Sequence, residues 1–165
     1  MTDFAIRAAR PEEAGELGAL ALRSKAHWEY DAAFMEACRE ELVIPPDQVA
    51  LRRTYVAVSR GPDADPSAPG ERRQRILGFG TIEGEPPAGE LGMLFVDPPA
   101  IGRGVGGALF SHLAAVAVEA GFHRLTIASD PNAEPFYLAK GAVRIGAVPS
   151  GSVPGRTLPL LAFAL

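Results

Sequence analysis

The chain has 165 residues, of which 47% are hydrophobic and 22% are charged, and its formal net charge is −4. This composition excludes a disordered or fibrous protein, and the length suits a single domain over residues 1–165. The acidic balance lacks the basic excess that nucleic-acid binding requires, so no nucleic-acid partner is expected.

The first third of the chain predicts one strand and two helices. Residues 4–7 form the strand, and Pro11 opens a helix whose first turn carries acidic side chains. A second helix begins after Asp31, a residue type that caps helix N-termini, and is expected to end at the prolines of residues 45–46. Both helices carry an apolar stripe and should pack against a sheet.

The middle of the chain predicts three strands. Residues 55–58 and 76–82 are apolar runs of strand length, and the stretch 61–70 between them is rich in Pro, Gly, Ser and Asp, which predicts a hairpin loop. A turn at residues 86–89 leads into 90–96, a largely apolar run that is typical of a central strand. We expect the strands 76–82 and 90–96 to pair as antiparallel neighbours.

The C-terminal half predicts two helices and three strands. Residues 104–120 carry apolar side chains at helical spacing, and Gly121 follows where a C-terminal cap belongs. The remaining elements are a strand at 124–128, a helix at 133–140 that ends at Gly141, and strands at 143–148 and 158–165. This order of elements predicts an α+β domain with a mixed, mostly antiparallel sheet of about seven strands flanked by helices.

The cysteine content and the hydropathy of the chain indicate where in the cell the protein is expected. Cys38 is the single cysteine, so no intrachain disulfide can form, and a cytoplasmic location is expected. The first ten residues mix charged with apolar side chains, and no run of about 18 apolar residues occurs. We therefore predict no signal peptide, no membrane span and no membrane partner. No Cys/His cluster has the spacing of a metal site, so no metal is expected.

The strongest chemical signal is a glycine-rich turn between the strand that ends at Val96 and the helix 104–120. Glycines at a helix start let successive backbone N–H groups face an anion, and the helix dipole adds to the attraction. We expect the diphosphate of a nucleotide-type cofactor to lie on the residues of this turn, which are Gly102, Arg103, Gly104, Val105, Gly106 and Gly107.

The glycine pattern of the turn also fits other kinds of site. Gly102, Gly104 and Gly107 also satisfy G-x-G-x-x-G, with Asp130 as a ribose-binding acid, which would indicate a nicotinamide-dinucleotide domain. Five residues separate Val96 from Gly102, however, and too little chain follows to complete a doubly wound sheet. A P-loop lacks its Gly-Lys-Ser/Thr, and a purely structural tight turn is the remaining alternative.

Together with a second motif, the turn resembles the GNAT superfamily of acetyltransferases. The family's turn reads Arg or Gln, any two residues, Gly, any residue, then Gly or Ala; here Gly104 and Gly106 match, and Ile101 holds the first place. The second motif is residues 130–141, which resemble Asn-x-x-Ala-x-x-Phe-Tyr-x-x-x-Gly. The resemblance implies a sheet whose central strands splay apart and acetyl-CoA as the cosubstrate.

The resemblance also implies cofactor contacts beyond the turn. Leu94, Phe95 and Val96 would offer backbone groups to the pantetheine arm and the acetyl carbonyl. Asp130 occupies the motif's asparagine position by count, but Asn132 is favoured as the pantetheine contact because an amide can both donate and accept.

Transfer to an amine needs a base, an oxyanion donor and an acid for the departing thiolate. The resemblance places Tyr137 beside the sulfur as the acid, and Glu90 at a position where some relatives carry a base; an exposed strand end is the alternative for Glu90. The scattered histidines at 27, 112 and 123 are further candidates for the base, and His27 beside Trp28 is the one worth testing.

The segment 24–30 lies between the first two helices, where this fold builds its acceptor pocket. Trp28, Glu29 and Tyr30 could bind a cationic amine by charge and cation–π contact, although a packed helix–helix turn is an equal alternative. The resemblance thus implies an acetyl-CoA-dependent N-acetyltransferase that acts by direct transfer on a small-molecule or peptide amine, and a homodimer is the candidate assembly. The alternative is a non-catalytic acyl-CoA-binding sensor.

Overall fold

A computed structural model describes residues 3–60 and 74–165. Within these residues the strands are β1 (Phe4–Ala8), β2 (Tyr55–Ser59), β3 (Ile76–Glu85), β4 (Ala88–Val96), β5 (Arg124–Ala128), β6 (Val143–Pro149) and β7 (Thr157–Ala164). The α-helices are α1 (Ala14–Ala26), α2 (Ala32–Cys38), α3 (Gln48–Leu51), α4 (Val105–Glu119) and α5 (Glu134–Ala139), and short 3-10 helices cover Pro11–Glu13, Glu40–Leu42 and Pro98–Ala100. The hairpin loop predicted at 61–70 lies outside the described residues.

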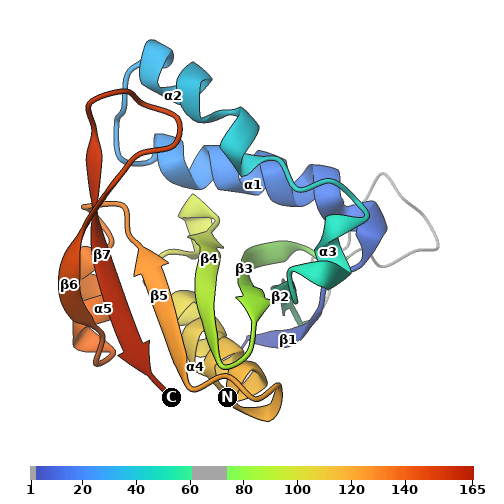
Figure 1. The fold of residues 1–165 in the computed structure, drawn as a ribbon. Coiled ribbons are helices and arrows are strands. Elements are labelled where there is room, and N and C mark those ends of the chain that lie inside the picture. The colour runs from blue at the N-terminus through green and yellow to red at the C-terminus, as the bar shows by residue number, and fades with distance from the viewer. Residues whose placement is uncertain (1–2, 61–73) are drawn as a thin grey trace, which may run out of the picture.

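The seven strands form one sheet in the order β1-β2-β3-β4-β5-β7-β6. Every neighbouring pair is antiparallel except β4 and β5, which run parallel and pair only through Ala88–Glu90 and Arg124–Thr126. Figure 1 shows the two strands spreading apart beyond that short ladder. The predicted α+β class, the mixed and mostly antiparallel sheet, and its splayed centre are confirmed.

Helices cover both faces of the sheet, as Figure 1 shows. On one face, Leu17 and Leu20 of α1 pack into a buried cluster with Phe79 of β3. On the other face, Leu109 and Leu113 of α4 pack against the sheet in two further buried clusters. The apolar stripes that the sequence showed on these helices are therefore the surfaces that hold them to the sheet.

Helix α4 approaches β3 closely because two glycines leave room for it. A Cβ atom on Gly80 would lie 2.5 Å from Cδ1 of Leu113 and 3.0 Å from the carbonyl oxygen of Met93, and Gly78 is similarly crowded by Phe95 and Leu109. The end of the Leu113 side chain can shift, but the Met93 carbonyl belongs to the backbone of β4 and cannot, so a side chain at position 80 must disturb the packing between β3, β4 and α4.

We expect Gly80→Val to lower the free energy of unfolding by about 1–3 kcal/mol, because overpacking forces the helix off the sheet. Urea denaturation measures the change. Gly146→Val is the matched control, since Gly146 also lies in a strand but a Cβ there meets no atom within 4 Å. Equal destabilisation by the two variants would show that the close approach of α4 at position 80 does not decide the result.

A bulge in β4 changes which face its side chains reach. Thr81 pairs with Met93 and Ile82 pairs with Leu91, so Gly92 has no opposite residue. In a regular strand, residues two apart face the same side of the sheet. Because of the bulge, Leu91 packs on the α4 side and Met93 on the α1 side. The space left by the missing side chain of Gly92 is filled by the carboxylate of Glu83.

The predicted helix boundaries hold at three points. The Asp31 side chain accepts a hydrogen bond from Phe34 N at 2.8 Å and caps α2, and Gly121 and Gly141 adopt positive φ angles of 96° and 102° just after α4 and α5. Two details differ from the prediction. Helix α2 stops at Cys38 and a 3-10 turn follows before the prolines, and the four-residue α3 was not expected because it is too short to show periodicity.

No helix in the described parts of the chain is long and apolar enough to cross a membrane.

Candidate active site

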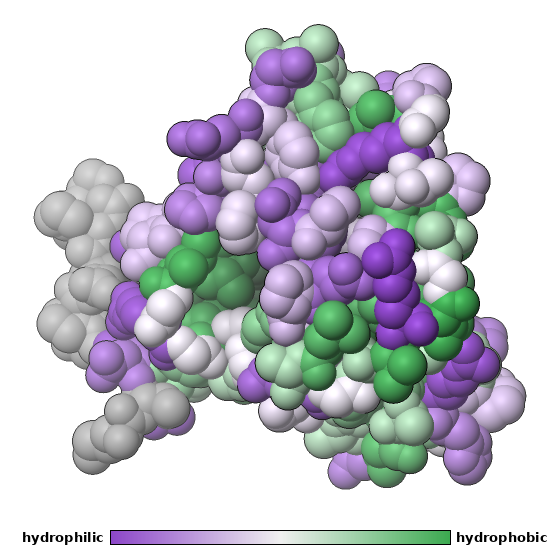
Figure 2. Space-filling model, turned by 90° about the vertical axis from the view of Figure 1, so that its left-hand side faces the viewer, coloured by the Kyte–Doolittle hydropathy of each residue, from purple (hydrophilic) through white to green (hydrophobic). Residues whose placement is uncertain are grey.

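A cavity of about 760 Å³ opens where β4 and β5 separate. Its walls come from α1, β4, the glycine-rich turn, the end of β5 and α5. Figure 2 shows a hollow with an apolar floor on the side of the molecule that faces left in Figure 1. The volume is in the usual range for small-molecule and cofactor sites.

The upper part of β4 forms one wall of this cavity. Leu94, Phe95 and Val96 all line it. The ladder to β5 ends at Glu90, so the backbone groups of the following residues that face β5 have no strand partner there in the described structure. Unpaired backbone N–H and C=O groups at a cavity wall are available to an extended ligand.

The glycine-rich turn forms the adjoining wall at the N-terminus of α4. Gly102 and Gly104 have positive φ angles of 87° and 82°, which favour glycine, and Gly104 is the N-cap residue. The N–H groups of the first helical turn have no acceptor within the helix and can face an anion. Of the predicted turn residues, Gly102, Gly104, Val105, Gly106 and Gly107 line the cavity; Arg103 does not, and its guanidinium lies 3.8 Å from the Asp3 carboxylate.

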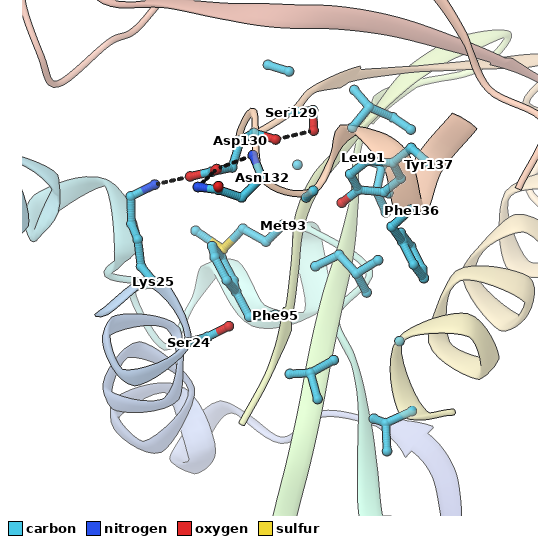
Figure 3. Close-up of a pocket in the computed structure, with 18 of the residues that line it drawn as sticks. Ser24, Lys25, Leu91, Met93, Phe95, Ser129, Asp130, Asn132, Phe136 and Tyr137 are labelled. Carbon is cyan, nitrogen blue, oxygen red and sulfur yellow. Dashed lines mark hydrogen bonds and ion pairs between the residues drawn. The ribbon is translucent and has the colours of Figure 1, made fainter. Parts of the chain in front are cut away.

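Tyr137 reaches the cavity from α5, opposite β4 (Figure 3). Only 6% of the residue is exposed, and its ring contacts Phe110 and Phe136 at centroid distances of 6.1 and 5.2 Å. Burial, and secondarily the negative charge of Asp130, raise the pKa of the Tyr137 phenol. The phenol therefore stays protonated at neutral pH and can act as a hydrogen-bond or proton donor.

Glu90 lies on β4 at the last rung of the ladder to β5, and its side chain lines the cavity. It is directly opposite Glu83 on β3, which also lines the cavity and accepts a 2.7 Å hydrogen bond from Thr81 Oγ1. Burial raises the pKa of the Glu90 carboxyl, and the negative charge of Glu83 adds to the rise. Like charges opposite one another destabilise a sheet, so this pair costs stability at neutral pH.

The predicted acceptor residues divide between two environments. Trp28 lines the cavity and is 45% exposed. Glu29 adopts a left-handed backbone conformation (φ 61°) and lies outside the lining. Tyr30 also lies outside the lining: its ring stacks on Phe34 at 3.9 Å, and the Lys25 ammonium and the Arg156 guanidinium lie 5.7 and 5.2 Å from its centroid. The protein's own cations thus occupy the surroundings of the Tyr30 ring.

Asp130 and Asn132 follow β5, and both line the cavity (Figure 3). Asp130 is the centre of a polar cluster that the sequence did not predict: it forms ion pairs with Lys25 and Arg156, each at 3.5 Å, and accepts hydrogen bonds from the Tyr30 hydroxyl. Burial alone would raise the pKa of Asp130, but the hydrogen bonds from Asn132 and Tyr30 and the charge of Lys25 outweigh it and lower the pKa.

The three histidines contribute nothing to the cavity lining. His27 packs edge-on against Trp28, and His112 packs against Tyr55 with its Nε2 atom buried and without a hydrogen-bond partner among the described residues. Cys38 is 1% exposed, as a core position requires. No group of His, Cys, Asp or Glu residues suited to a metal ion occurs in the stretches 3–60 and 74–165.

A sheet that parts beside a glycine-rich helix start, with a buried tyrosine at the gap, defines an acyltransferase fold. The model of the Acetyltransferase (GNAT) family matches residues 26–141, which is more than half of the chain. The protein belongs to this family and is an N-acetyltransferase by class.

Solved structures agree with this assignment. The GCN5-related N-acetyltransferase from Rhodopseudomonas palustris is 25% identical, with a TM-score of 0.75 over 100% of this chain and 98% of the other. YjaB from Escherichia coli is also 25% identical, with a TM-score of 0.63 over 98% and 96% of the two chains. PaiA N-acetyltransferase from Thermoplasma acidophilum, solved with coenzyme A, shares the fold at 15% identity, with a TM-score of 0.71 over 98% and 99%. A search of curated protein sequences finds no match.

Proposed function

We propose that residues 1–165 form one catalytic domain that moves the acetyl group of acetyl-CoA directly to a primary amine. The observation that carries the proposal is the unpaired edge of β4 facing the glycine-rich turn across one cavity. A diphosphate needs backbone N–H donors, and a pantetheine arm needs strand-like partners, so this wall suits coenzyme A. The solved PaiA structure contains coenzyme A in the same fold.

The cofactor residues divide by the chemistry they offer. The turn Gly102–Gly107 supplies the anion site, with Val105, Gly106 and Gly107 at the start of α4. Arg103 belongs to this set only through its backbone, because its side chain turns away toward Asp3. Leu94, Phe95 and Val96 offer main-chain groups to the pantetheine arm and the acetyl carbonyl, and Asn132 offers a side-chain amide.

The chemistry needs the acceptor nitrogen to lose two protons, one before it attacks and one after, and the departing thiolate to gain one. Glu90, as a carboxylate, accepts a proton from the ammonium of the acceptor through water, which leaves a neutral amine. The amine nitrogen then forms a bond to the acetyl carbonyl carbon, and backbone N–H groups of β4 stabilise the resulting oxyanion. When the carbon–sulfur bond breaks, Tyr137 gives its proton to the thiolate, and the second proton of the amine nitrogen returns to Tyr137 through water. The products are the acetylated amine and free coenzyme A, and no covalent enzyme intermediate is needed.

The lining of the cavity has more acidic than basic groups. Glu41, Glu83 and Glu90 line it, against Arg52 and Lys25, and the charge of Lys25 is already paired with Asp130. Trp28 adds an exposed aromatic face to the same lining. This lining favours a cationic small-molecule or peptide amine over an acidic acceptor.

Ligand binding tests the proposal directly. Acetyl-CoA at about 100 times its dissociation constant is expected to raise the stability of the protein by roughly 2.7 kcal/mol, which a thermal unfolding scan detects. A screen of primary amines then follows the release of coenzyme A thiol. No shift with acetyl-CoA or with free coenzyme A would contradict the proposal, and a shift with NAD alone would indicate a dinucleotide site.

We expect Gly106→Glu to abolish most acetyl-CoA binding without loss of the ligand-free unfolding midpoint. A Cβ at position 106 meets only ordinary contacts with Val96 and Phe136, and an acid in the first turn suits the helix dipole, so the fold is retained. A carboxylate about 5 Å from a phosphate charge costs roughly 3 kcal/mol at an effective dielectric constant of about 20. Isothermal titration measures the affinity.

Gly106→Gln is the control for size, because it adds the same bulk without the charge. Its loss of affinity should be much smaller than that of Gly106→Glu, and it should not decrease at high salt. If the two variants bind acetyl-CoA equally weakly, the turn is sterically sensitive but is not an anion site.

A non-catalytic acyl-CoA sensor is the second candidate. The observation that favours it is Ile101, which is 46% exposed at the start of the turn, where the family carries a polar side chain. Acetyl-CoA binding without turnover across the amine screen would support the sensor; turnover of any primary amine would support the enzyme.

A further inference from the structure

The polar cluster around Asp130 joins three segments that are far apart in the sequence. Lys25 and Tyr30 come from the end of α1 and the connection that follows it, and Asp130 and Asn132 come from the connection between β5 and α5. Arg156 comes from the loop between β6 and β7. Lys25, Asp130 and Asn132 line the cavity, whereas Tyr30 and Arg156 lie behind them. The cluster is thus an outer support for a wall of the cofactor cavity.

The Tyr30 hydroxyl has a single proton, and its partners determine where that proton goes. It lies 3.0 and 2.8 Å from the two oxygens of Asp130, which as a carboxylate can only accept. It also lies 3.0 Å from Arg156 Nη2, which can only donate. The hydroxyl therefore donates to Asp130 and accepts from Arg156.

These assignments also fix the orientation of the Asn132 amide. One amide atom lies 3.0 Å from the Tyr30 oxygen and 3.0 Å from Asp130 Oδ1. Since the hydroxyl proton is used and the carboxylate only accepts, that amide atom must be the NH₂ group. The backbone N–H of Asn132 donates to the same Asp130 oxygen at 2.8 Å, which holds the residue from a second point. Figure 3 shows the Asp130–Asn132 contacts at the cavity wall.

We propose that Tyr30 is a positioning residue that acts through Asn132: together with Asp130 it engages the amide NH₂, so that Oδ1 of Asn132 is presented as an acceptor for an N–H group of the pantetheine arm. This inference rests on the proposed function, because it assumes that acetyl-CoA occupies the cavity. It gives Tyr30 a role different from the amine binding predicted from the sequence. The ring is already flanked by Lys25 and Arg156, and the hydroxyl is fully engaged.

A double-mutant cycle on acetyl-CoA binding tests the inference. Tyr30→Phe keeps the ring stacked on Phe34 and removes only the hydroxyl; Asn132→Ala removes the amide. Each single variant of the full chain should bind acetyl-CoA about 5-fold to 10-fold more weakly, which is the usual effect of one hydrogen bond. Because Tyr30 acts through Asn132, the double variant should bind no more weakly than Asn132→Ala alone. Titration calorimetry gives the dissociation constants.

Two further measurements separate positioning from a general structural role. Tyr30→Phe should raise the KM for acetyl-CoA and leave kcat within about twofold, since only cofactor binding is affected. Tyr55→Phe, the same chemical change at a tyrosine that packs on His112 outside the cavity, should leave both constants unchanged.

The inference is overturned if the effects of the two single variants multiply in the double variant, or if Tyr30→Phe binds acetyl-CoA as tightly as the wild type. Failure of the wild type itself to bind acetyl-CoA is a different result, because it contradicts the proposed function. Circular dichroism on the wild type, the two single variants and the double variant establishes that each is folded before its affinity is compared.

Discussion

Replacement of Tyr137 by Phe is expected to lower kcat by about 100-fold to 1,000-fold, the usual range for loss of a general acid, with little change in acetyl-CoA affinity. The phenol is buried and its raised pKa keeps the proton on the oxygen across the neutral range, so only this proton is lost in the variant. The ring and its contacts with Phe110 and Phe136 remain, which preserves the packing of α5.

Steady-state kinetics with a reactive amine, at saturating acetyl-CoA, measures the loss. A second acyl donor with a more acidic thiol makes the test more specific. Its thiolate leaves with less need for protonation, so the difference in kcat between Tyr137→Phe and the wild type should be smaller than with acetyl-CoA. A kcat close to that of the wild type, with the natural donor, would assign Tyr137 to the aromatic core alone.

The features that the sequence predicted well are local ones. Asp31, Gly121 and Gly141 define helix ends through contacts with residues a few positions away, and the structure confirms them. The glycine-rich turn is equally local, since the positive φ angles of Gly102 and Gly104 and the start of α4 at Gly104 depend on consecutive residues. The order of strands and helices also predicted the sheet class, because short connections leave few topologies.

The features that the sequence did not predict depend on distant residues. The bond between Tyr30 and Asp130 spans 100 positions and that between Arg156 and Tyr30 spans 126, so no spacing rule connects them. The bulge at Gly92 is also invisible in the sequence, because β4 reads there as a regular apolar strand. Only the pairing with β3 shows that Gly92 is the extra residue and that Glu83 fills its space.

The pair formed by Glu83 and Glu90 gives the second large expected effect. Glu90→Gln should lower kcat/KM by about 100-fold at neutral pH, because an amide cannot accept the proton of the ammonium. In the proposed mechanism Glu90 works as a carboxylate, so activity should fall as the pH drops through its pKa. Burial and the charge of Glu83 raise that pKa, which places the acid limb of the pH profile above the range of an ordinary glutamate.

Glu83→Gln is the matched variant that identifies the group behind this limb. It removes the charge opposite Glu90 and keeps an oxygen that can accept the hydrogen bond from Thr81. The pKa of Glu90 should therefore fall, and the acid limb of kcat/KM should move to lower pH. An acid limb that stays in place in Glu83→Gln would show that another group titrates there.

The same shift predicts the effect on stability. Because the pKa of Glu90 is higher in the folded protein than in the unfolded chain, folding favours the protonated form; the stabilisation is fully present below the unfolded pKa and is lost as the pH rises through the folded pKa. Glu90→Gln should consequently unfold at a higher temperature than the wild type at neutral pH, and the difference should disappear in acid. A variant that is less active yet more stable than the wild type is the expected result if the Glu90 carboxylate serves catalysis and destabilises the sheet.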